Sequence, residues 1–266
     1  MTDIWGTPAR PRPASRAAYR PSPIFLAIVA AFGGSGWALW TGAFQARYAA
    51  FLFVLAGWLL SLCLHEYAHA VLAYRGGDHS VAAQGYLTLD PFKYTHAMYS
   101  IVLPLLFVLL GGIGLPGGAV YINRSALRGR LRESVVSAAG PLTNVGFALA
   151  TLIPVALFAP TDADHVAFWA ALSFLGFLQV TASLLNLLPV PGLDGFGIAE
   201  PWLPPTWPEA ASKIAPFGIL ILFALLWIPA LNRAFFDAVF WFLGLFGVPT
   251  ELVALGNQLF RFWQSF

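Results

Sequence analysis

Residues 51–78 read FLFVLAGWLLSLCLHEYAHAVLAYRGGD, a long apolar run that contains two histidines and a glutamate. An apolar run of about 20 residues is long enough to cross a bilayer as a helix. A charged group near the bilayer centre costs at least about 2.5–3.5 kcal/mol, so ionisable groups in such a run usually serve a functional site. This stretch therefore predicts a membrane-spanning helix that carries a site.

The composition of the whole chain is that of an integral membrane protein. Of its 266 residues, 59% are hydrophobic and 10% are charged, against about 45–50% and about 25% in soluble domains. The net charge of +2 is too small to indicate nucleic-acid binding. Cys63 is the single cysteine, which excludes an internal disulfide and a cysteine-rich metal site. We therefore expect the lipid bilayer, and no nucleic acid, as a partner.

Six apolar segments are long enough to span a membrane, which predicts an all-α polytopic fold. They lie at about residues 24–44, 48–74, 134–159, 166–189, 212–231 and 234–250. Together they form a transmembrane domain over residues 24–250. The Pro- and Arg-rich arm at 1–23 is predicted to be disordered. The tail at 251–266 sets Arg and Gln among Trp, Phe and Leu, which indicates an interfacial helix, although a packing role fits equally well.

The basic residues predict how the chain is oriented. Arginines are frequent in the arm at 1–23, so the positive-inside rule places this arm in the cytoplasm. A second basic cluster, at 124–132, follows the apolar stretch 97–115. The cluster stays inside if 97–115 is a re-entrant element, which its glycines and proline allow; a seventh span is the alternative. Both termini are then cytoplasmic at the cell membrane, and residues 81–89 (VAAQGYLTL) are expected to form a short cytoplasmic β-rich segment.

His65 and His69 are four residues apart, which places both imidazoles on one face of a helix, one turn apart. Two imidazoles in this arrangement can bind a single Zn²⁺. Glu66 can deprotonate a water molecule that the metal activates, as in the H-E-x-x-H arrangement of metallopeptidases. A buried hydrogen-bonded cluster without metal is the alternative.

The predicted zinc site needs a third protein ligand, because a catalytic zinc ion has three of them and an open position. Asp194 is the best candidate, since it closes an otherwise apolar span at NLLPVPGLDG (186–195). The re-entrant topology brings it to the same side of the membrane and a similar depth as His69. An ordinary Asp-Gly turn at a helix end is the alternative.

Two motifs of the chain, HEYAH (65–69) and NLLPVPGLDG (186–195), resemble the signatures of the site-2 proteases, H-E-x-x-H and N-x-x-P-x-P-x-L-D-G. The stretch AAGPLTN (138–144) is similar to a small-residue motif common in the intervening span of that family. The resemblance covers about residues 50–200, the expected catalytic core.

The resemblance implies an intramembrane zinc metalloprotease that takes part in regulated intramembrane proteolysis. It implies that His65, His69 and Asp194 bind zinc and that Glu66 is the catalytic base. The substrates would be membrane-spanning proteins, cut near the cytoplasmic face.

Two asparagines are candidate substrate-binding residues. Asn186 lies on a polar stripe with Gln179 and Ser183 on one side of its helix, and Asn144 ends the motif AAGPLTN. We expect both asparagines to donate hydrogen bonds to the substrate backbone. Polar packing between helices is the alternative.

Two other functions fit parts of the sequence. A membrane zincin of another kind would complete its site with a later glutamate, but Glu200 follows a Gly-rich turn and precedes a proline, so it fits poorly. A catalytically inactive metal-binding scaffold or transporter would have no need of Glu66.

Overall fold

The structure, a computed structural model, describes residues 16–94, 106, 120–159, 162, 164–204 and 206–264. All regular structure in these residues is helical, which confirms the all-α class. Except for residue 106, the predicted re-entrant element at 97–115 lies outside the described residues. Residues 1–15 of the predicted arm lie outside them as well.

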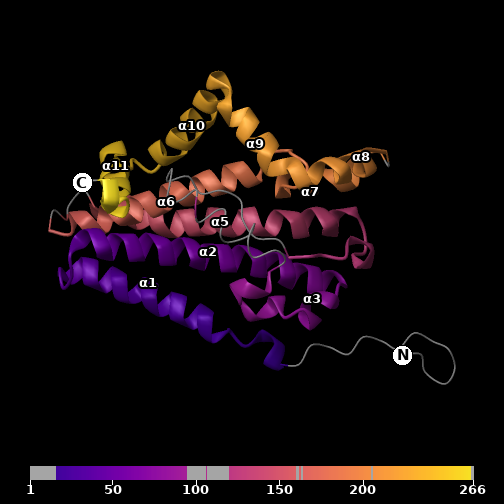
Figure 1. The fold of residues 1–266 in the computed structure, drawn as a ribbon, viewed down its shortest axis with the longest axis horizontal. Coiled ribbons are helices and arrows are strands. Elements are labelled where there is room, and N and C mark those ends of the chain that lie inside the picture. Colours follow the sequence, from indigo (N-terminus) through magenta and orange to yellow (C-terminus); the bar gives the residue numbers. More distant parts are fainter. Residues whose placement is uncertain are drawn as a thin grey trace.

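Four long helices lie side by side and form the body of the molecule (Figure 1). They are α1 (Pro23–Thr41), α2 (Ala46–Gly76), α5 (Arg130–Phe158) and α6 (Val166–Asn186). The central helix is α6, which packs against each of the other three and is buried almost throughout. A helix buried on all sides must be apolar all round, and α6 accordingly has no charged residue.

The other elements are short helices and 3-10 turns (η). They are η1 (Arg16–Tyr19), α3 (Ser80–Ala83), η2 (Tyr86–Thr88), η3 (Pro91–Lys93), η5 (Arg124–Ala126), α7 (Asp194–Ala199), η7 (Glu200–Trp202), α8 (Thr206–Ile214), η8 (Ala215–Phe217), α9 (Gly218–Trp227), α10 (Pro229–Gly244), α11 (Thr250–Phe260) and η9 (Phe262–Gln264).

Five helical stretches in the described part of the chain are long and apolar enough to cross a membrane. They are Pro23–Thr41, Ala46–Gly76, Arg130–Phe158, Val166–Asn186 and Thr206–Trp227. The predicted count of six spans is therefore not confirmed. Thr206–Trp227 contains α8, η8 and α9 and overlaps the predicted span 212–231, so the difference lies at the predicted span 234–250, where the chain forms α10.

The helix α10 is too short to be a full span by itself. Its 16 residues correspond to about 24 Å, against a hydrocarbon core of about 30 Å. The chain breaks between α9 and α10 because Ile228 is extended and Pro229 begins α10. Figure 1 shows the two helices meeting at a bend that stands away from α6.

The two described ends of the chain lie at opposite ends of α2. The ring of Tyr19 contacts Tyr74, near the C-terminal end of α2, whereas the ring of Phe262 contacts Tyr48, near its N-terminal end. These contacts do not show which side of a membrane each end faces, so the two cytoplasmic termini stay a prediction.

The prediction of a β-rich segment at residues 81–89 is wrong, because these residues form α3 and η2. The side chains of Val81, Tyr86 and Leu87 are all buried in one cluster with residues of α2. In a strand, consecutive side chains point to opposite faces, so Tyr86 and Leu87 could not both reach this cluster. A tight helical turn lets them do so.

The tail predicted at 251–266 to be an interfacial helix is packed into the protein as α11. Phe260 is fully buried. A Cβ atom on Gly256 would lie only 2.1 Å from the carbonyl oxygen of Ala170, so α11 approaches α6 at backbone distance. This helix therefore packs against the bundle, and its position at the membrane interface stays a prediction.

Candidate metal centre

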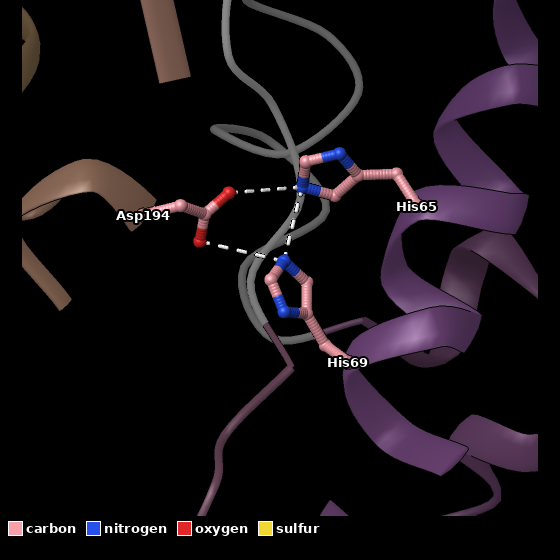
Figure 2. A group of neighbouring side chains, drawn as sticks. All are labelled: His65, His69 and Asp194. Atoms are coloured by element: carbon pink, nitrogen blue, oxygen red, sulfur yellow. Dashed lines mark hydrogen bonds and ion pairs between the residues drawn. The ribbon is translucent and has the colours of Figure 1, made fainter. Parts of the chain in front are cut away.

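His65, His69 and Asp194 each direct one ligand atom toward a common point (Figure 2). The Nε2 atoms of the two imidazoles are 3.1 Å apart. The carboxylate of Asp194 faces both of them, with Oδ2 3.2 Å from Nε2 of His65 and Oδ1 3.4 Å from Nε2 of His69. The structure thus brings the predicted third ligand beside the predicted pair. Two imidazoles and one carboxylate form a ligand set typical of catalytic zinc.

Both histidines project from the same face of α2, as their i, i+4 spacing predicts. Their ring centroids are 4.8 Å apart and both side chains are buried. Neither ring is exposed to lipid, because α5 covers this face of α2.

Gly140 of α5 makes room for the two imidazoles. A Cβ atom at this position would lie 2.2 Å from Nε2 of His69 and 2.3 Å from Nε2 of His65, distances that real side chains do not adopt. The missing side chain leaves space at the point where the ligand atoms converge. This space and the donor set fit a metal ion.

A hydrogen bond sets the tautomer of His69. Its Nδ1 atom lies 2.7 Å from the carbonyl oxygen of Val136 on α5. A carbonyl oxygen can only accept, so Nδ1 carries the proton and donates it. The lone pair of Nε2 is then free to face His65 and Asp194, as in most metal-binding histidines.

Asp194 begins α7, directly after the turn that follows α6. The turn closes tightly, since a Cβ atom on Gly195 would lie 2.2 Å from the carbonyl oxygen of Leu187. Burial raises the pKa of the Asp194 carboxyl, but the charges and hydrogen bonds of His69 and His65 outweigh it and hold this pKa below its usual range. A carboxylate at this position is suited to be the third ligand of a catalytic metal ion.

The segment that carries Asp194 is fastened to the start of α5. Ser134 donates a hydrogen bond to the carbonyl oxygen of Ile198 at 2.7 Å and accepts one from the indole Nε1 of Trp202 at 2.9 Å. Glu200 forms an ion pair with Arg124. Glu200, the ligand that a rival kind of zincin would need, is thus engaged elsewhere and is not part of the cluster.

Glu66 lies beside the cluster and is only 2% exposed. Its Oε2 accepts a hydrogen bond from the backbone N–H of Val120 at 3.0 Å. Its Oε1 lies 3.9 Å from Nε2 of His65. One carboxylate oxygen is therefore held by the backbone, and the other lies close to a ligand atom of the cluster.

Asn144 and Asn186 are both buried and line the same small cavity as His65, with a volume of about 10 Å³. A larger cleft of about 270 Å³ adjoins Asp194, between the start of α5 and α8. The two predicted substrate-binding residues thus lie near the predicted ligands. The cleft gives Asp194 a route to the exterior of the protein.

Sequence reasoning missed the backbone groups of Val120 and Val136 and the role of Gly140. A backbone N–H or carbonyl has no residue letter of its own, so no motif could have identified the first two. Gly140 lies in the small-residue stretch AAGPLTN, which was a signal for close approach, although not for which groups approach it.

Comparisons with known proteins give a consistent set of relatives. The chain is 49% identical over 254 residues to "Putative zinc metalloprotease Rip2" of Mycolicibacterium smegmatis, covering 94% of this chain and 97% of the relative. It is 47% identical over 252 residues to the protein of the same name from Mycobacterium tuberculosis, covering 93% and 96%. It is 30% identical over 178 residues to "Putative zinc metalloprotease YwhC" of Bacillus subtilis, covering 63% and 76%. No family model and no solved structure matches the chain.

Proposed function

Because the chain belongs to the site-2 protease family of zinc metalloproteases, we propose that it hydrolyses peptide bonds of membrane-spanning substrate proteins within the bilayer. Its partners are these substrates and the lipid of the cell membrane. The convergence of His65, His69 and Asp194, with Glu66 beside them, is the observation that carries this proposal.

The reaction takes place near the cytoplasmic face. His69 is seven residues before Gly76, the last residue of α2, which corresponds to about 10 Å from that helix end. The arginine-rich arm leads to the same end of α2, where Tyr19 contacts Tyr74. Positive charge favours the cytoplasmic side, so this end of the bundle faces the cytoplasm.

His65, His69 and Asp194 would hold a zinc ion, whose chemistry when bound is to make water more acidic and to polarise the scissile carbonyl. Glu66 accepts the proton of the attacking water and passes it to the leaving amine. The N–H of Val120 on Oε2 keeps this carboxylate in one orientation. His65, Glu66 and His69 are buried, whereas Asp194 lines the cleft.

The substrate must be unwound where it is cut, because the carbonyls of a helix are already hydrogen-bonded. An unwound backbone in an apolar region needs new partners. Asn144 and Asn186 are buried amides beside His65, and each carries two N–H donors. Both donate hydrogen bonds to the substrate backbone in this mechanism.

The alternative is a catalytically inactive metal-binding scaffold or transporter. Glu66 argues against it, since a buried carboxylate next to the ligands costs folding free energy and metal binding alone does not need it. Its position suits a proton acceptor beside the metal.

The substitution Glu66→Gln tests the proposal. Glutamine keeps the shape of the side chain but cannot accept the proton, so we expect cleavage of a single-span model substrate in lipid vesicles to fall by a factor of about 10²–10⁴. The zinc content should stay at one ion per chain, whereas His65→Ala should lose the zinc. Glu251→Gln, an exposed change at the start of α11, is the matched control and should cleave normally. Normal cleavage by Glu66→Gln would contradict the proposal.

A further inference from the structure

The two histidines of the metal centre differ in what their second ring nitrogen does. Nδ1 of His69 donates to the carbonyl oxygen of Val136. Nδ1 of His65 is buried and has no hydrogen-bond partner among the residues that the structure describes. Figure 2 shows this nitrogen on the side of the ring that points away from His69 and Asp194. A metal-binding histidine almost always donates its other ring N–H to a partner, because that bond sets the tautomer and the ring orientation.

Asn144 has a matching unsatisfied group. The side chain is buried on α5, and its Oδ1 is likewise without a partner in the described part of the chain. A buried acceptor without a hydrogen bond costs about 1–3 kcal/mol. A donor on His65 and an acceptor on Asn144 are therefore both left in need of a partner.

The small cavity lies against both of these residues. Its volume is about 10 Å³, about the space that one water molecule needs. His65, Asn144 and Asn186 supply polar groups to its wall, and Trp58, Leu62 and Ala182 close it with apolar ones. Ser61 also lines it, but its hydroxyl already donates to the carbonyl oxygen of Trp58 at 2.9 Å. A buried water needs two to four polar partners, and this cavity offers them.

From this geometry we propose that one ordered water molecule bridges Nδ1–H of His65 and Oδ1 of Asn144, and that Asn144 is thereby a positioning residue for the metal centre. The water accepts the proton of Nδ1–H and donates one of its own to Oδ1. With the proton on Nδ1, the lone pair of Nε2 faces His69 and Asp194.

This inference rests on the proposed zinc site, but it makes a claim about zinc affinity in the absence of substrate. The test is a competition of the purified full-length protein with a chromogenic zinc chelator. We expect Asn144→Leu, which removes the acceptor and fills the cavity, to bind zinc about 10-fold more weakly. Asn144→Asp should stay within about threefold of the wild type, because a carboxylate oxygen still accepts from the bridge.

Thr151→Val is the matched control. Thr151 is also buried on α5, seven residues further along, but its hydroxyl bonds to the carbonyl oxygens of its own helix. Its zinc affinity should equal that of the wild type. Equal affinity of Asn144→Leu and the wild type, or equal losses in Asn144→Leu and Asn144→Asp, would overturn the inference.

A crystal structure of the zinc-loaded wild type gives a second measurement that does not depend on whether the variants fold. Ordered water within about 3 Å of both Nδ1 of His65 and Oδ1 of Asn144 is expected, and an empty cavity would overturn the bridge. Failure of the proposed function would look different, because the wild type itself would then bind no zinc.

Discussion

At the scale of single residues, Gly140 lies on α5 where that helix faces the imidazoles of His65 and His69. Gly140 matters to the metal centre because it has no side chain. Any side chain here would occupy the space into which the two Nε2 atoms point. The absence of a side chain at Gly140 leaves the space in which the ligand atoms of His65 and His69 lie.

The substitution Gly140→Ala is therefore expected to disable the metal centre. The added methyl group would lie 2.2–2.5 Å from ring atoms of His69 and His65, so the imidazoles must move. A displacement of about 1 Å can cost about 10²-fold in rate, and we expect losses of at least that size in zinc affinity and in cleavage. Chelator competition and cleavage of a model substrate measure the two.

Gly146→Ala on the same helix separates this effect from a general effect on α5. A Cβ atom on Gly146 would have no neighbour within 4 Å. Alanine is a better helix former than glycine by about 0.5–1 kcal/mol, so this variant should be at least as stable as the wild type and fully active. Normal zinc binding by Gly140→Ala would contradict the packing described above.

At the scale of elements, the start of α5 holds the segment that carries Asp194. Ser134 is the centre of this contact, since it bonds both the backbone at Ile198 and the indole of Trp202. Because Asp194 follows a turn, contacts that hold this segment in place also hold the carboxylate in place. The bonds of Ser134 thus keep Asp194 in reach of the two histidines on α2.

The substitution Ser134→Ala should weaken the metal site without removing any ligand. It deletes two hydrogen bonds, each with a net contribution of about 1 kcal/mol, and we expect zinc affinity to fall about 5- to 10-fold. Ser212→Ala is the control, because Ser212 also lines the cleft beside Asp194 but bonds the carbonyl oxygen of Glu209 in its own helix. An unchanged zinc affinity in Ser134→Ala would show that Asp194 is held by other contacts.

At the scale of the whole molecule, the two described ends of the chain lie far apart along α2. The described N-terminal and C-terminal segments contact α2 at Tyr74 and at Tyr48, respectively. The 26 residues between these contacts correspond to about 39 Å of helix, more than the hydrocarbon thickness of a bilayer, about 30 Å. From this separation we expect the two segments to emerge on opposite sides of the membrane, in contrast to the two cytoplasmic termini expected from the sequence.

Cysteine labelling in intact cells checks this arrangement. In a Cys63→Ala background, which has no other cysteine, Arg20→Cys and Gln264→Cys each place one thiol at an exposed position. A membrane-impermeant maleimide should label Gln264→Cys directly but Arg20→Cys only after permeabilisation. If both thiols are labelled only after permeabilisation, both termini are cytoplasmic and the expectation of opposite sides is wrong.

Much of this protein follows from the sequence by itself. A chain so poor in charge has to be a membrane protein, and in a bilayer an apolar segment satisfies its backbone as a helix. The types and spacing of His65, Glu66 and His69 identify the metal chemistry, because one helical turn brings the two imidazoles to the same side. Asp194 could be named as a candidate because a charged residue at the end of an apolar span is costly in a membrane and therefore usually serves a functional site.

Only the tertiary structure decided the rest, because the remaining features depend on groups that meet across different helices. The carbonyl of Val136, the N–H of Val120 and the space at Gly140 act on α2 from other segments. The count of six spans is not confirmed for a related reason: apolar composition over 212–250 measures hydrophobicity, while the break at Pro229 divides this stretch into separate helices. Local pattern determines which residues belong in lipid and which bind metal, and long-range packing determines how they face one another.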